Sequence, residues 1–168
     1  MKISEKLPQF NKRSLIIVTG SQVGEVYLAY KGEIEKLDNF KAINPKHSNK
    51  EGFFVRSGQG TTFGSGAVLE ENKHKVTGEF LKQMKLSIEK IISKNEIDEF
   101  YLLFPDHIKN ELYQNLSFDI QSKVVLFIDG NFTDIHPFDF LEKIKKEIDG
   151  RKTKVMSEEA MKILKKKE

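Results

Sequence analysis

The chain has 168 residues, of which 38% are hydrophobic and 32% charged, and its formal net charge is +3. These values fit one compact domain with a single hydrophobic core, and the absence of cysteine excludes a disulfide framework or a thiolate zinc site. No apolar run approaches the roughly 20 residues needed to cross a bilayer, and the N-terminus lacks the apolar segment of a signal peptide. We therefore expect a cytoplasmic protein that does not associate with membranes.

The first half of the chain predicts three strands in an antiparallel meander. Residues 15–18 are a continuous apolar run, which is typical of a strand buried on both faces at the centre of a sheet. Residues 26–30 alternate in the manner of a second strand. A more broken pattern follows over residues 34–40, after a predicted turn at Lys31-Gly32.

A long polar and glycine-rich excursion, residues 43–70, separates the meander from the most clearly predicted helix, residues 71–92. Excursions of this length inside a compact domain are usually functional or disordered. The helix is predicted by apolar residues at helical spacing, with lysine and glutamate on its other faces. The apolar residues are Val76, Phe80, Met84, Ile88, Ile91 and Ile92.

The second half predicts a parallel strand pair. Residues 100–104 and 124–128 are apolar runs, and the amphipathic stretch between them completes a βαβ unit. We therefore predict one α/β domain over residues 1–149, with a mixed five-stranded sheet and helices on both faces. Asp106 is a candidate helix N-cap, and His136 is expected to form a cap or turn before Pro137. Residues 150–168 are predicted to be a basic tail with a separate short helix capped by Ser157.

The order and spacing of these segments, from about residue 14 to 148, resemble the central domain of eukaryotic and archaeal class-one release factors and of the rescue factor Pelota. The segments that carry the resemblance are the hairpin at 15–34, the helix at 71–92, and the elements at 100–105, 107–116 and 124–129. The ending over residues 129–144 is more similar to a stand-alone bacterial and archaeal branch that includes proteins labelled host-attachment proteins. The resemblance implies a fold broadly like that of ribonuclease H.

Residues 56–66, Arg-Ser-Gly-Gln-Gly-Thr-Thr-Phe-Gly-Ser-Gly, form the candidate site. Ser57-Gly58-Gln59 occupies the place of the Gly-Gly-Gln tripeptide with which release factors help water attack the ester of peptidyl-tRNA. The resemblance thus implies a catalytic Gln59 supported by the flexible backbone of Gly58, and His74 is a candidate acid or base near the loop. Because Ser57 replaces the first glycine, a different turn and a loop that only contacts RNA remain the alternative.

Basic residues before this loop predict contacts with phosphate groups. Lys46, Lys50 and Arg56 are the candidate RNA-binding residues, and Glu51 is the acidic residue among them. They favour a ribosome or tRNA as the partner. The alternative is a solvated, lysine-rich surface.

Two enzyme classes and one binding function complete the alternatives. A two-metal nuclease is disfavoured because the first strand ends in Thr19-Gly20-Ser21 without a carboxylate. A nucleotide-hydrolysing enzyme is disfavoured because the glycine loop lacks the Lys-Ser/Thr of a P-loop. We therefore expect no metal and no cofactor. The alternative function is a non-catalytic protein-interaction module of the host-attachment type. Its contact segment would be residues 155–164, which bind a protein partner or a second copy.

Overall fold

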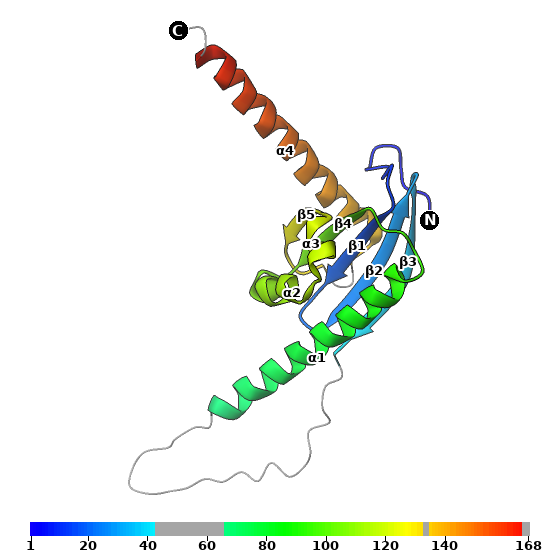
Figure 1. Cartoon of the computed structure of the whole chain (residues 1–168), viewed down its shortest axis with the longest axis vertical. Helices are drawn as coiled ribbons and strands as arrows, with labels where there is room; N and C mark the ends of the chain where they lie inside the picture. The colour runs from blue at the N-terminus through cyan, green and yellow to red at the C-terminus, as the bar shows by residue number, and fades with distance from the viewer. Residues whose placement is uncertain (43–65, 133–134, 166–168) are drawn as a thin grey trace, which may run out of the picture.

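The computed structural model describes residues 1–42, 66–132 and 135–165, with side chains described over residues 1–42, 75–132 and 135–153. The strands are β1 (Ser14–Thr19), β2 (Val23–Tyr30), β3 (Glu33–Lys41), β4 (Glu99–Phe104) and β5 (Val124–Asp129). The helices are α1 (Gly66–Ile92), the 3-10 helix η1 (Asp106–Ile108), α2 (Lys109–Asn115), α3 (Phe118–Ser122) and α4 (Pro137–Lys165). Figure 1 shows their arrangement around one sheet.

The sheet has the order β3-β2-β1-β4-β5. β1 pairs antiparallel with β2 and parallel with β4, while the outer pairs are antiparallel β2–β3 and parallel β4–β5. All six residues of β1 are buried, as expected for a central strand in which residues 15–18 are continuously apolar. The predicted single-domain α/β fold with a mixed five-stranded sheet is confirmed.

The turn between β2 and β3 lies where the sequence places it. Lys31 and Gly32 have φ values of 48° and 76°, so both central residues are left-handed, as a two-residue hairpin of the type I′ class requires. The amide of Gly32 donates to the carbonyl of Gln9 at 2.7 Å, and the amide of Ile3 donates to the carbonyl of Gly32. The N-terminal residues are therefore fastened to this turn.

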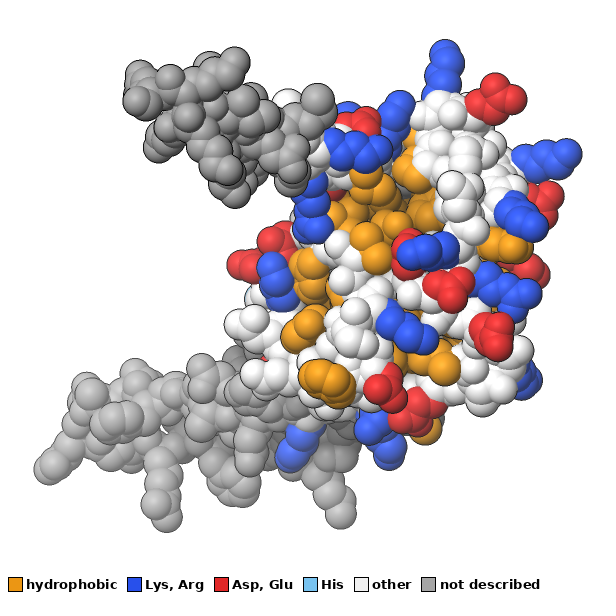
Figure 2. Space-filling model, turned by 45° about the horizontal axis from the view of Figure 1, so that its top comes forward, with side chains coloured by type: hydrophobic (Ala, Val, Ile, Leu, Met, Phe, Trp, Pro, Cys, Tyr) orange, Lys and Arg blue, Asp and Glu red, His pale blue; other side chains and the backbone are white. Residues whose placement is uncertain are grey.

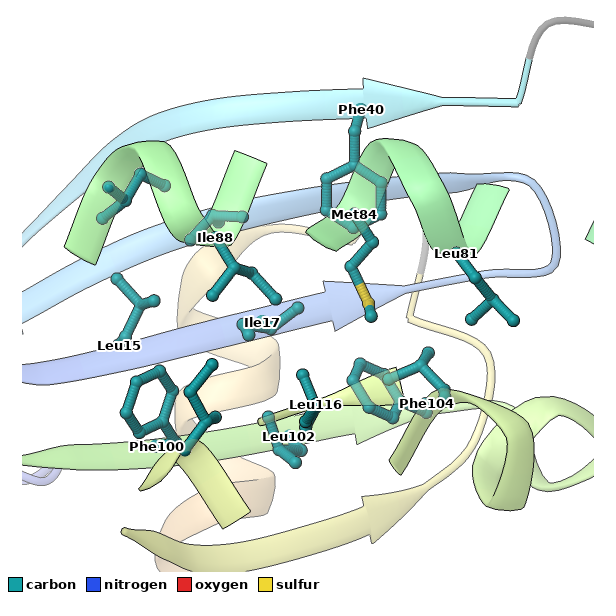
Figure 3. Close-up of a cluster of buried hydrophobic side chains, with 14 of the residues drawn as sticks. Leu15, Ile17, Phe40, Leu81, Met84, Ile88, Phe100, Leu102, Phe104 and Leu116 are labelled. Carbon is teal, nitrogen blue, oxygen red and sulfur yellow. The ribbon is translucent and has the colours of Figure 1, made fainter. Parts of the chain in front are cut away.

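Helices cover both faces of the sheet. α1, α2 and α3 lie on one face, where Phe80, Met84 and Ile88 of α1 join the same core cluster as inward side chains of β1 and β4. Figure 3 shows Met84 and Ile88 pointing toward Ile17 of β1. α4 covers the other face with Phe140, Leu141 and Ile144. Over the described residues, none of the helices combines the length and the apolar character that crossing a bilayer would require.

Three sequence-based predictions about helix ends were wrong. α1 begins at Gly66, so residues 66–70, which were predicted to be irregular, are helical. α4 is one helix through Gly150 to Lys165, so no separate helix starts at a Ser157 cap. The N-cap of η1 is Pro105, which lies in an extended conformation, and Asp106 is the first helical residue.

The prediction for His136 holds. The amide of Phe138 donates to Nδ1 of His136 at 3.3 Å, and the amide of Asp139 donates to its carbonyl at 2.9 Å. His136 therefore caps the first turn of α4, where the unpaired amides of a helix need acceptors. Pro137 follows at the first helical position, which suits its fixed φ.

Candidate functional site

The candidate site lies at the edge where four strands end together. β3 runs antiparallel to β2, which runs antiparallel to β1, so β3 has the same direction as β1, β4 and β5. We call the edge formed by the carboxyl ends of these four strands the carboxyl edge. Residues 43–65 connect the end of β3 with the start of α1, and α1 continues past this edge beyond the sheet (Figure 1).

The residues predicted to act in this segment are Lys46, Lys50, Arg56, Gly58 and Gln59, and they lie outside the described residues. The remaining candidate, His74, belongs to α1, and its side chain also lies outside the described part. All six stay predictions. The structure does describe the elements that hold both ends of the segment.

The β3 end of the segment is fixed by close packing. Phe40 is 6% exposed, and its ring lies over Gly24 of β2 so closely that a Cβ on Gly24 would come within 2.9 Å of the ring atom Cε1. On its other side, Phe40 packs against Phe80 of α1, with ring centroids 5.2 Å apart. The amide of the buried Ala42 then donates to the carbonyl of Gln22 at 2.8 Å. The chain thus leaves the sheet from a well-packed position.

A polar contact joins the same two elements further along. The hydroxyl of Ser87 in α1 donates to Oδ2 of Asp38 in β3 at 2.9 Å, and Ser87 is 6% exposed. Nζ of Lys90 lies 3.9 Å from the same carboxylate oxygen. Burial strengthens such a hydrogen bond because water does not compete well for its partners. β3 and α1 are therefore bound directly to each other, independently of the segment between them.

Two polar side chains meet at the carboxyl edge beside β1. Oγ of Ser21 lies 3.3 Å from Nε2 of His107, although the residues are 86 positions apart in the chain. A serine next to a histidine is the start of a nucleophile-and-base arrangement, but that chemistry needs a third group to orient the imidazole. No hydrogen bond to Nδ1 of His107 is found among the described residues. The pair therefore acts as an exposed link between the β1–β2 turn and η1.

Thr19, the last residue of β1, is fully buried, and its hydroxyl has no hydrogen-bond partner among the described residues. In the sheet it pairs with Gly24 and therefore lies beside the packed Phe40 ring. Burying a hydroxyl without a partner costs free energy.

Carboxylates near this edge are neutralised by lysines. Nζ of Lys109 lies 3.0 Å from Oδ1 of Asp129 and 4.3 Å from the centroid of the Phe127 ring. On β2, burial tends to raise the pKa of Glu25, but hydrogen bonds from Lys36 and Tyr27 outweigh it, so the pKa lies below its usual value. Glu25 is therefore ionised and paired at neutral pH. Across the described residues, no three histidine or acidic side chains converge in a way that would hold a metal ion.

Sequence reasoning did not bring Ser21, His107, Lys109 and Asp129 together. Each follows or ends a strand, and β1, β4 and β5 are adjacent and parallel, so the signal was their shared position at strand ends. The distance of 3.3 Å between Ser21 and His107 depends on the shape of the β1–β2 turn, which local sequence does not determine.

No family model matches the sequence. No curated protein matches it either. Among solved structures, the chain is similar to the archaeal translation termination factor aRF1, with a TM-score of 0.49 and 10% identity over 88% of this chain and 42% of that one. It is also similar to an archaeal protein with a TM-score of 0.35 and 9% identity, over 74% of this chain and 32% of that one. The chain thus spans less than half the length of either protein, and similarities at this level assign no function.

Proposed function

We propose that this protein is a ribosome- or tRNA-associated translation factor that acts in the rescue of stalled ribosomes. The proposal rests on the position of Ser57-Gly58-Gln59, which falls in the segment that leaves the carboxyl edge between β3 and α1. α1 extends past that edge, so the α1 end of the segment is held away from the sheet, whereas the β3 end leaves the sheet directly (Figure 1). This attachment suits a loop that enters a narrow site on a large partner.

In the proposed reaction, water attacks the carbonyl carbon of the ester that joins the peptide to tRNA. The bond from that carbon to the ribose oxygen breaks, the peptide leaves as a carboxylic acid, and the ribose oxygen takes up a proton. Gln59 would orient the water through its amide, Gly58 would supply the backbone conformation, and His74 would donate or accept a proton. Whether the chain is an enzyme depends on this step.

Binding would depend on phosphate contacts by Lys46, Lys50 and Arg56. Each such contact releases counterions, so the affinity falls as salt rises. Replacing all three residues by alanine should weaken ribosome binding. The plot of log affinity against log salt should also become less steep by roughly 2, because each lost contact to a single strand removes about 0.7 from the magnitude of the slope.

The first test is co-sedimentation of the protein with ribosomes from stalled cells at low and high salt. The wild type is compared with the Lys46/Lys50/Arg56 triple alanine variant and with a control triple variant at Lys6, Lys82 and Lys146. The control removes the same charge from exposed positions of the described part. Loss of salt-sensitive binding in the first triple variant alone supports the proposal, whereas equal loss in both shows a nonspecific charge effect and contradicts it.

The second test separates binding from catalysis. Gln59→Ala should leave co-sedimentation unchanged and abolish release of the peptide from stalled complexes. Peptide release by Gln59→Ala at the wild-type rate would contradict the catalytic role. Absence of the wild type from ribosomes under every salt condition would contradict the whole proposal.

A non-catalytic interaction function is the second candidate, and the length of α4 favours it. The helix has 29 residues, and the residues from Gly150 to Thr153 are all exposed, so its second half projects from the body (Figure 1). In that case, deleting residues 150–168 would abolish binding to the partner, and Gln59→Ala would have no effect.

A further inference from the structure

An open groove of about 920 Å³ lies between the second half of α1, the connection to β4, and α3. Figure 2 looks onto this face, where hydrophobic side chains gather in a hollow between charged ones. The apolar lining residues are Ile88, Ile92, Ile97, Phe100, Leu116 and Ile120. An apolar floor with a polar rim is typical of a protein-binding surface.

The rim of the groove has a small excess of negative charge. Its carboxylates are Glu89, Glu96, Asp98 and Asp119, and its ammonium groups are Lys85, Lys94 and Lys123. Four negative against three positive charges leave a net charge of −1. Of these cations, Lys123 also donates a hydrogen bond to the carbonyl of Ile97 at 2.8 Å. The rim therefore favours a basic occupant.

An exposed aromatic side chain stands next to the groove. Phe118, the first residue of α3, is 82% exposed, and it directly precedes the groove residues Asp119 and Ile120. The start of α3, which carries Phe118, is capped because the Ser117 side chain accepts a hydrogen bond from the amide of Ile120 at 3.4 Å. Exposed aromatic residues on rigid elements are common anchors of protein interfaces.

The same chain carries a segment with the complementary character. At 1.5 Å per residue, the 29 residues of α4 span about 43 Å. Among the residues of α4 whose side chains are described, the last buried one is Ile144, and Ile148 is half-buried. The second half of the helix extends beyond the body (Figure 1). A helical stretch of that length gains most of its stability from packing an apolar face against a partner.

The sequence of this projecting half provides both an apolar stripe and a positive charge. Met156, Ala160, Ile163 and Leu164 follow helical spacing over residues 154–165. Residues 154–165 contain three basic side chains, Lys154, Lys162 and Lys165, against Glu158 and Glu159, which gives a net charge of +1. Charge and hydrophobicity of the segment both match the groove.

We propose that residues 154–165 of one copy dock in this groove of a second copy, with Phe118 of the second copy covering the helix. A reciprocal exchange would form two such contacts in one dimer, which brings the buried surface toward the size of a stable interface. The inference is independent of Gln59 and of ribosome binding, because it concerns the opposite end of α1 and a different helix.

The absence of cysteine from the chain allows a direct test by crosslinking. Asp119→Cys places a thiol on the groove rim, and Ala160→Cys places one on the projecting half of α4. The two single variants, one carrying a tag that changes its mass, are mixed and oxidised. A mixed disulfide dimer should form and should greatly exceed the dimer formed by Ala160→Cys alone. Glu111→Cys, an exposed position outside the groove, replaces Asp119→Cys in the matched control and should give no mixed dimer.

A second measurement addresses the affinity. Light scattering with size-exclusion chromatography should give twice the chain mass of 19.4 kDa for the wild type at micromolar concentration. The double variant Glu96→Lys/Asp119→Lys should weaken dimerisation roughly tenfold or more, whereas Glu111→Lys/Glu142→Lys should not. A monomeric wild type, or a disulfide that joins Ala160→Cys only to itself, would overturn the proposed docking.

Discussion

Replacing Gly24 by alanine tests the packing that holds the candidate site, because two effects of opposite sign compete at this position. Gly24 has no positive φ, so alanine fits the backbone, and the substitution alone would stabilise the protein by about 0.4–1 kcal/mol through the unfolded state. The new Cβ would, however, lie 2.5 Å from Cε2 and 2.9 Å from Cε1 of Phe40. Real Cβ atoms essentially never approach other atoms this closely.

The Phe40 ring would have to move, and it has little room. It is 6% exposed and packs on Phe80 at 5.2 Å, so displacement costs about 1–3 kcal/mol for overpacking and loses part of an aromatic pair worth about 0.5–1.5 kcal/mol. Subtracting the gain from the unfolded state leaves a net loss of about 1–2 kcal/mol. For a chain of this size, Tm should fall by about 2–8 °C.

Urea unfolding followed by circular dichroism measures this loss, with the denaturant slope expected to stay unchanged. A Gly24→Ala/Phe40→Leu double variant provides the control, because a smaller side chain at position 40 leaves space for the new methyl group. The loss of unfolding free energy in the double variant should be smaller, by about 1 kcal/mol, than the sum of the losses in the two single variants. A Gly24→Ala protein that is as stable as the wild type, or additive single effects, would refute the proposed close packing.

Three further predictions concern other parts of the fold. Thr19→Val removes the buried hydroxyl that has no described partner, so the free energy of unfolding should rise by about 1 kcal/mol in urea titrations; a loss of stability would show that the hydroxyl is satisfied. Gly150→Ala should stabilise the protein by about 0.5–1 kcal/mol and raise its helicity, because Gly150 lies within α4 with open space around it, whereas a helix break at this position would give no gain. Burial raises the pKa of Tyr27 and of Tyr101, and the carboxylates of Glu25 beside Tyr27 and Glu99 beside Tyr101 raise it further. Two of the four tyrosines should therefore ionise only at a pH above the usual tyrosine range in an ultraviolet titration. Because the unfolded chain releases those protons near pH 10 and the folded chain keeps them, stability should fall as the pH rises above about 10, and less so in Tyr27→Phe.

The sheet was predictable because its signals are local. The continuous apolar run of β1 indicated a central buried strand, and the alternation in β2 together with Lys31-Gly32 indicated a hairpin. The periodicity of α1 from Val76 to Ile92 identified the helix that covers one face. In each case the residue pattern and the packing that it produces repeat over several positions, so a single unusual residue does not change the result.

The helix ends were not predictable because single residues were given too much weight. Gly150 costs about 1 kcal/mol in a helix interior, which is a small penalty in a helix of 29 residues that packs through Phe140, Leu141 and Ile144. The contact between Ser21 and His107 was missed for a different reason. It joins residues 86 positions apart, and only the parallel pairing of β1 with β4 brings their strand ends together.

The contacts between β3 and α1 explain why a long segment can be inserted at this point of the fold. Phe40 packs directly on Phe80, and Asp38 accepts a hydrogen bond from Ser87, so the two elements that flank residues 43–65 hold each other in place. The separation of the ends of the segment is therefore set by the sheet and the helix. Substitutions inside the segment, such as Gln59→Ala, should then leave the free energy of unfolding within about 0.5 kcal/mol of the wild type. Loss of function in that variant, together with an unchanged urea midpoint, would be a property of the loop, whereas a lower midpoint would show that the segment itself supports the core.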